Sequence, residues 1–88
     1  MVGKTLLVAN RMGLHARPAA LLARAAGKYQ CHVRIAKNEV EVNGKSVMGL
    51  MMLAAECGSK LAVTCDGSDE RQALEEIEQL FNGKFKEE

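Results

Sequence analysis

Short segments with one apolar side follow one another along the whole chain of 88 residues. Some alternate apolar and polar residues or form a short apolar run, as strands do, and others repeat apolar residues at helical spacing. One-sided strands need a cover, which one-sided helices can supply. The sequence therefore predicts one α+β domain over residues 1–88, a two-layer sandwich whose four-stranded, mainly antiparallel sheet is covered on one face by three helices (βαββαβα). The predicted strands are 4–9, 32–37, 39–43 and 60–65, and the predicted helices are 16–26, 46–54 and 68–83.

The apolar faces of these segments define the expected core. The helix at 16–26 presents small residues at positions 19, 23 and 26 together with Leu22, so it can lie close to the sheet. The strands 32–37 and 39–43 are expected to form a hairpin, with Val40 and Val42 on its buried face. The last helix is predicted to begin after a Ser68 cap and to end at Gly83, and its buried face comprises Leu74, Ile77 and Phe81.

Composition narrows the functions open to the chain. Aromatic residues make up 3% of it and Trp is absent, so it lacks the stacking platforms that bind single-stranded nucleic acid. No apolar run approaches the roughly 18 residues of a membrane span, and the N-terminal apolar stretch is too short for a signal peptide. We therefore expect a cytoplasmic protein that does not insert into membranes.

The cysteines favour neither a disulfide framework nor a metal site. Three residues, an odd number at wide spacing, form no CxxC pair. We expect buried, reduced thiols at Cys31, Cys57 and Cys65.

The small net charge of +1 conceals an asymmetry along the chain. Residues 1–38 carry seven basic and no acidic residues, whereas residues 39–88 carry five basic and eleven acidic ones. A basic half indicates an anionic partner, which could be a nucleic acid, a phosphorylated group or an acidic protein surface. The alternative is that the charges average out in the folded chain.

The stretch MGLHARPAALL at 12–22 places His15 at the entrance to a predicted helix, where Ser, Thr, Asp or Asn would be the better cap. The free N–H groups and the dipole at a helix start stabilise an anion. A neutral imidazole has one unprotonated nitrogen that can attack phosphorus, and Arg17 can pair with phosphate oxygens. Gly13 permits a sharp turn, and Pro18 stiffens the helix start. These residues fit a reversible phosphohistidine site, with an ordinary surface histidine as the alternative.

Other chemistry lacks the residues that it needs. A hydrolase would need a base, an orienting group and an oxyanion site, and a metal site would need more ligands than His15, His32 and Cys31 supply. We therefore expect no metal and no cofactor.

Two motifs together resemble a known family. GLHARPAA at 13–20 and KSVMGLMML at 45–53 are similar to the motifs of HPr, the histidine-containing phosphocarrier family of the bacterial phosphoenolpyruvate-dependent sugar phosphotransferase system. The resemblance covers essentially the whole chain. It implies an open-faced β-sandwich and a monomeric carrier rather than an enzyme.

The resemblance also implies roles for individual residues. His15 would accept a phosphoryl group from phosphorylated enzyme I on Nδ1, as a pros-phosphohistidine, and pass it to IIA domains of sugar transporters. Arg17 would steady the phosphate, and the backbone amides of Ala16 and Arg17 would face it.

The second motif implies regulation. Ser46 suits a helix N-cap, and by resemblance it is also the serine that a dedicated kinase/phosphorylase modifies in carbon catabolite regulation. A transcription regulator would then be a further partner.

The resemblance also implies a docking patch for enzyme I and IIA proteins. Its residues would be Leu14, Ala20, Arg24, Val47, Met48 and Met51.

Two alternatives stay open at this point. The stretch LFNGKF at 80–85 is faintly similar to the nitrogen-branch phosphocarriers, which control metabolism or transcription rather than sugar uptake. A small nucleic-acid-binding domain would also suit the basic first half, but the chain has no stacking aromatics and no known motif for it. We expect no nucleic-acid partner.

Overall fold

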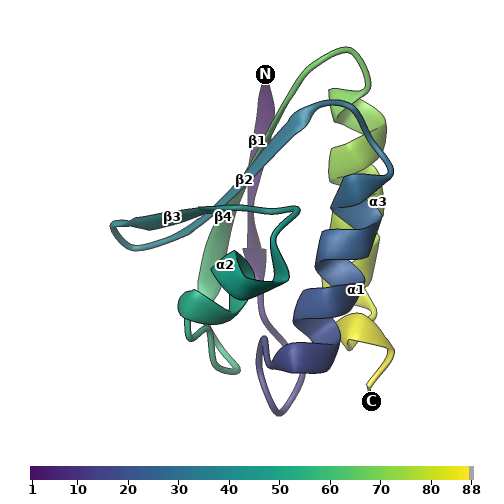
Figure 1. Ribbon diagram of the computed structural model, residues 1–88. Coiled ribbons are helices and arrows are strands. Elements are labelled where there is room, and N and C mark those ends of the chain that lie inside the picture. Colours follow the sequence, from purple (N-terminus) through teal and green to yellow (C-terminus); the bar gives the residue numbers. More distant parts are fainter. Residues whose placement is uncertain (88) are drawn as a thin grey trace.

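A four-stranded antiparallel sheet in the order β1-β4-β2-β3 is covered on one face by three helices in the computed structural model, which describes residues 1–87 (Figure 1). The predicted fold class and element order are confirmed. In chain order the elements are β1 (Val2–Leu7), α1 (Ala16–Gly27), β2 (His32–Lys37), β3 (Val40–Asn43), α2 (Val47–Met52), β4 (Lys60–Asp66), α3 (Glu70–Asn82) and a short 3-10 turn, η1 (Lys84–Lys86).

The two faces of the sheet differ as predicted. Residues at alternate positions of β1, β2 and β4 point into the helical layer and are buried, among them Leu6, Ile35 and Val63. Their neighbours Thr5, Arg34 and Ala62 lie on the other face and are exposed. One face of the sheet is therefore open to water.

The small apolar face of α1 lies close to the rest of the core, as expected. Ala19, Leu22 and Ala26 are completely buried. Because the side chains of Ala19 and Ala26 are short, the helix axis can lie close to its neighbours without leaving a gap. Figure 1 shows α1 and α3 side by side along the same face of the sheet.

The first strand begins and ends two residues earlier than the predicted 4–9. Val2 pairs with Cys65 and Leu7 with Lys60, so β1 is in register with β4 along its whole length. β1 ends at Leu7 because Lys60, its partner, is the first residue of β4. Val8 is nevertheless buried, and its N–H donates to Ser59 O at 2.8 Å. The apolar run thus marked Leu6 and Val8 correctly as buried, but it was wrong for Leu7, which is 50% exposed, and for the ends of the strand.

The expectation of a buried face on β3 is wrong for Val40, which is 50% exposed, and only partly right for the half-buried Val42. β3 is an edge strand that extends beyond the helices (Figure 1). The helix that packs against it is α2, and the contact lies near Gly49, where an added Cβ would come within 3.3 Å of the Val42 Cβ.

The start of α3 differs from the prediction. Ser68 is exposed, and Asp69 occupies the N-cap position without capping its own helix. Its carboxylate accepts instead from the N–H of Gln30 at 2.8 Å and of Cys31 at 2.9 Å, and these bonds, Gln30 first, lower the pKa of Asp69. A tertiary contact between two connections therefore fixes where α3 begins.

The end of α3 is followed by an element that the sequence did not indicate. Gly83 ends the helix as predicted, and η1 then turns the chain back and buries Phe85 against Phe81, with ring centroids 4.9 Å apart. On α3 itself Ile77 is buried as expected, but Ala73 rather than the half-buried Leu74 completes the inner face. The turn brings the C-terminal end beside the first turn of α1 (Figure 1).

The prediction for the cysteines is right for two and wrong for one. Cys31 and Cys65 are 1% and 0% exposed, whereas Cys57 is exposed in the turn before β4. All three are free thiols. Among the described residues, no helix is long and apolar enough to cross a membrane.

The thiols should differ sharply in reactivity. Burial raises the pKa of Cys31, and burial together with the neighbouring Cys31 raises the pKa of Cys65 to about 11. Because the thiolate is the nucleophile, both should stay protonated and unreactive at about pH 8. We expect iodoacetamide to modify Cys57 alone in the native protein, as measured by mass spectrometry of tryptic peptides. Cys57→Ser is the control and should leave the native chain unlabelled; rapid labelling of Cys31 or Cys65 would contradict the buried arrangement.

Candidate functional site

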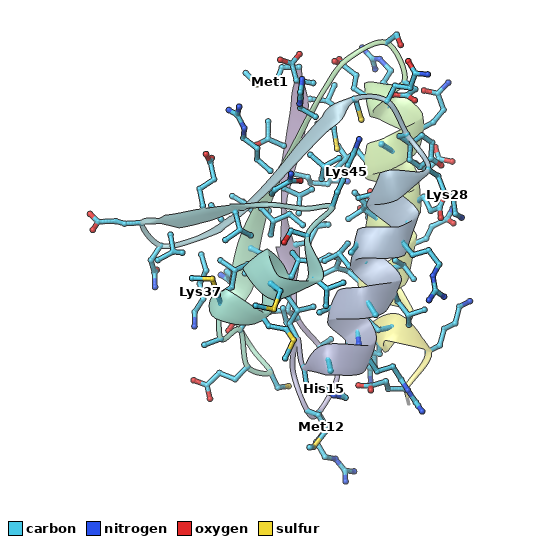
Figure 2. The ribbon with its side chains drawn as sticks, in the orientation of Figure 1. Met1, Met12, His15, Lys28, Lys37 and Lys45 are labelled. Carbon is cyan, nitrogen blue, oxygen red and sulfur yellow. The ribbon has the colours of Figure 1, made fainter. Side chains whose placement is uncertain are left out.

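His15 is the N-cap residue of α1, but its side chain does not cap the helix. Its backbone is extended (φ −82°, ψ −169°), and its carbonyl accepts from Ala19 N–H at 2.9 Å. Helical geometry gives the N–H groups of Ala16 and Arg17 no acceptor within the helix. The first turn of α1 therefore presents free donors beside a 40% exposed imidazole (Figure 2).

The loop before His15 is fixed by backbone geometry. Gly13 has φ +71°, and a Cβ there would lie 2.6 Å from Ala55 O, so glycine is required as the sequence suggested. Leu14 N–H donates to the same carbonyl at 2.7 Å. The amide of Asn10, a buried residue, donates to Gly13 O at 2.7 Å. These contacts hold the loop against the segment that follows α2.

Glu87 binds the imidazole from the other end of the chain. His15 Nε2 lies 2.7 Å from Glu87 Oε2, and Asn10 Nδ2 donates to Glu87 Oε1 at 2.8 Å. The pKa of Glu87 is lowered, most by the hydrogen bond from Asn10 and then by the bond to His15 and the charge of Arg17. Because an ionised carboxylate only accepts, Nε2 must be the donor, which leaves the lone pair of Nδ1 available in the neutral ring. Sequence reasoning missed Glu87, which lies 72 residues from His15.

Positive charge gathers on one side of this pair. A shallow hollow of about 380 Å³ is lined by Arg11, Met12, Arg17, Lys86 and Glu87. Arg17 is exposed, as a phosphate-binding side chain must be. A second depression, of about 280 Å³, lies on another side of His15 and includes Met12, Ala54 and Glu56.

Ser46 is the N-cap of α2, as predicted. Its Oγ accepts from Gly49 N–H at 3.0 Å, and the residue is half-buried. The hydroxyl therefore already has a structural role.

Exposed methionines lie on α2 and in the loop before His15. Met48, Met51 and Met52 of α2 are 75%, 45% and 74% exposed, and Met12 is 69% exposed. Met12 lies beside His15 (Figure 2). Val47 is 38% exposed. Met12 and Met52 were absent from the docking patch expected from the sequence.

The other residues expected in the docking patch differ in exposure. Arg24 is exposed and Ala20 is half-buried. Leu14 is 4% exposed and belongs to the core, so its side chain has little area to offer a partner. Its place in the docking patch therefore stays a prediction, which rests on the small exposed part that lines the depression beside His15.

Comparison with known proteins agrees with this geometry. Residues 2–83 match the family model described as "PTS HPr component phosphorylation site". The chain is 49% identical to the phosphocarrier protein HPr of Treponema pallidum over 88 residues, which cover 100% of both chains. The crystal structure of HPr-C-His from Thermoanaerobacter tengcongensis superposes with a TM-score of 0.96 at 38% identity, covering 100% of this chain and 99% of that one.

An open-faced sandwich with an exposed histidine at the start of its first helix is the architecture of a small carrier protein. The chain belongs to the HPr family of phosphocarriers of the bacterial phosphotransferase system. The resemblance noted from the two sequence motifs is confirmed.

Assembly varies among the structural neighbours. A crystal structure described as an HPr dimer from Thermoanaerobacter tengcongensis has a TM-score of 0.78 to this chain at 36% identity, covering 97% of this chain and 98% of that one. The expectation of a monomer therefore stays a prediction.

Proposed function

We propose that this chain accepts a phosphoryl group from phosphorylated enzyme I on Nδ1 of His15 and passes it to IIA domains of sugar transporters. The observation that carries the proposal is the bond between Nε2 and Glu87, which leaves Nδ1 as the free nucleophile beside the open start of α1. The chain is then a carrier in the cytoplasm, and its partners supply most of the catalysis.

The transfer needs no proton to move. The Nδ1 lone pair attacks phosphorus, and the bond from phosphorus to the donor's nitrogen breaks, with its electron pair returning to the donor. The ring keeps the proton on Nε2 and becomes positively charged. The amides of Ala16 and Arg17 and the guanidinium of Arg17 stabilise the attached phosphate. Transfer to a IIA domain reverses these steps.

Docking would use the methionines of α2. Met side chains adapt to differently shaped partners, which suits a surface that meets enzyme I and IIA proteins in turn. Arg24 lies about two helical turns beyond Arg17 on α1 and would form a basic rim that attracts acidic surfaces.

Sugar transport is favoured over the nitrogen branch because KSVMGLMML at 45–53 resembles the sugar branch more than LFNGKF resembles the nitrogen branch. Phe81 and Phe85 of the latter stretch pack on one another in the core. Nucleic-acid binding is disfavoured because two of the basic residues in the first half are paired, Lys4 with Glu78 and Lys28 with Glu76.

His15→Ala should abolish phosphoryl acceptance. Purified protein is incubated with phosphoenolpyruvate and enzyme I, and acid-labile phosphate on the chain is measured. His32→Ala, which removes the exposed histidine of β2, is the matched control and should accept label as wild type does. Equal labelling of His15→Ala and wild type would refute the proposal.

Met48→Ser should weaken docking without touching the chemistry. We expect KM for enzyme I to rise about fivefold, as for loss of an exposed apolar contact, with kcat nearly unchanged. Leu7→Ser is the control because Leu7 is a comparably exposed apolar residue of the sheet. A change in kcat with constant KM would argue against a docking role.

Phosphorylation of Ser46 should weaken transfer from enzyme I while α2 stays folded. In Ser46→Asp the carboxylate can still cap the helix but adds negative charge, so we expect a rise in KM of about tenfold at low salt. Ser68→Asp is the control on an exposed serine elsewhere. Ser46→Ala should lose about 1 kcal/mol of stability with normal transfer. Normal kinetics of Ser46→Asp would contradict the regulatory role.

A further inference from the structure

Glu87 has both carboxylate oxygens committed near the reacting ring. One oxygen lies 2.7 Å from His15 Nε2, and the other accepts from Asn10 at 2.8 Å. The Glu87 side chain is only 13% exposed. Carboxylates are usually solvated unless they are paired. A specific structure must therefore hold this one in place.

The chain adopts an unusual backbone to reach this position. Lys84, Phe85 and Lys86 have φ of 54°, 54° and 64°, which is the left-handed region that non-glycine residues rarely occupy. Burial of Phe85 against Phe81 compensates for the strain of the turn. Lys86 N–H donates to Gly83 O at 3.0 Å and Glu87 N–H to Lys84 O at 3.1 Å, which closes the turn.

Asn10 completes the arrangement. It is fully buried, and its side-chain amide donates to both Gly13 O and Glu87 Oε1. Its Oδ1 has no hydrogen-bond partner within residues 1–87. The side chain therefore serves as a donor, and one amide fixes the loop before His15 and the carboxylate behind it.

We propose that Glu87 is a positioning residue that holds the proton of His15 on Nε2, so that Nδ1 is the nitrogen phosphorylated, and that balances the ring's positive charge while phosphate is attached. The inference rests on the proposed function, since it concerns the same histidine. It parallels the way a buried carboxylate fixes an imidazole tautomer in enzymes.

A chemical phosphoryl donor separates this inference from the partners. In phosphoramidate, the lone pair of Nδ1 attacks phosphorus, the bond between phosphorus and nitrogen breaks, and ammonia leaves with the electron pair. Nε2 keeps its proton throughout. Because enzyme I is absent, the site of phosphorylation depends on the chain alone.

The experiment compares wild type, Glu87→Ala and the control Glu78→Gln. The control removes the charge of a carboxylate on α3 that pairs with Lys4 of β1. Each is treated with phosphoramidate, and phosphorus NMR distinguishes the Nδ1 from the Nε2 product. We expect wild type and the control to give mainly the Nδ1 product, and Glu87→Ala to raise the ratio of Nε2 to Nδ1 product about fivefold, as for loss of a partly buried charged hydrogen bond. An unchanged ratio in a folded Glu87→Ala variant overturns the positioning role.

Hydrolysis tests the balance of charge. Water attacks phosphorus, the bond to Nδ1 breaks with its electrons returning to the ring, and the proton on Nε2 lets the imidazole leave neutral. Glu87→Gln keeps an acceptor oxygen but lacks the negative charge that favours the proton on Nε2. Less of the phosphorylated ring should then carry this proton near neutral pH, so we expect hydrolysis to be about threefold slower. A rate equal to that of wild type and of Glu78→Gln overturns this part.

The same proteins distinguish the two proposals. If Glu87→Ala raises the ratio of Nε2 to Nδ1 product with phosphoramidate but enzyme I does not label wild type, the proposed function fails and the inference stands. If enzyme I labels every variant equally and the product ratio does not change, the inference fails and the proposed function stands.

Discussion

One buried amide connects the two ends of the site. Asn10 Nδ2 donates to the carbonyl of Gly13 and to the carboxylate of Glu87. The first bond shapes the loop that presents His15, and the second places the acceptor for Nε2. Asn10 is fully buried, so neither bond competes with bulk water. The orientation of the imidazole therefore depends on Asn10 through its bonds to Gly13 and Glu87.

The start of α1 is stabilised by packing rather than by a cap. A serine in place of His15 would be worth about 1 kcal/mol as a cap. The helix can do without it because Ala19, Leu22 and Ala26 are completely buried and the loop before it is bonded to Ala55. Its first amides thus remain available to an anion. Stability and an open helix start are compatible because different residues provide them.

Sequence predicted what local periodicity determines and missed what distant contacts determine. The elements and the placement of His15 and Arg17 follow from residues within a turn or two of one another. The N-cap of α3 depends on Asp69 reaching Gln30 and Cys31, 39 and 38 residues away. The position of the Glu87 carboxylate depends on a left-handed turn formed by non-glycine residues, and the usual turn residues do not predict such a turn. A C-terminal glutamate has no sequence signature that would connect it to a histidine near the other end.

The fold also explains why the basic half of the chain does not act as one surface. Glu76 and Glu78 of α3 pair with Lys28 and Lys4, so part of the positive charge is neutralised along α3. Arg17 and Arg24 remain exposed on α1, and Met48, Met51 and Met52 are exposed on α2. Exposed charge raises the rate at which two proteins associate more than it strengthens their complex. A small apolar contact gives a weak complex, and weakness shows mainly as fast dissociation. A carrier needs both properties, because it must leave one partner before it can serve the next.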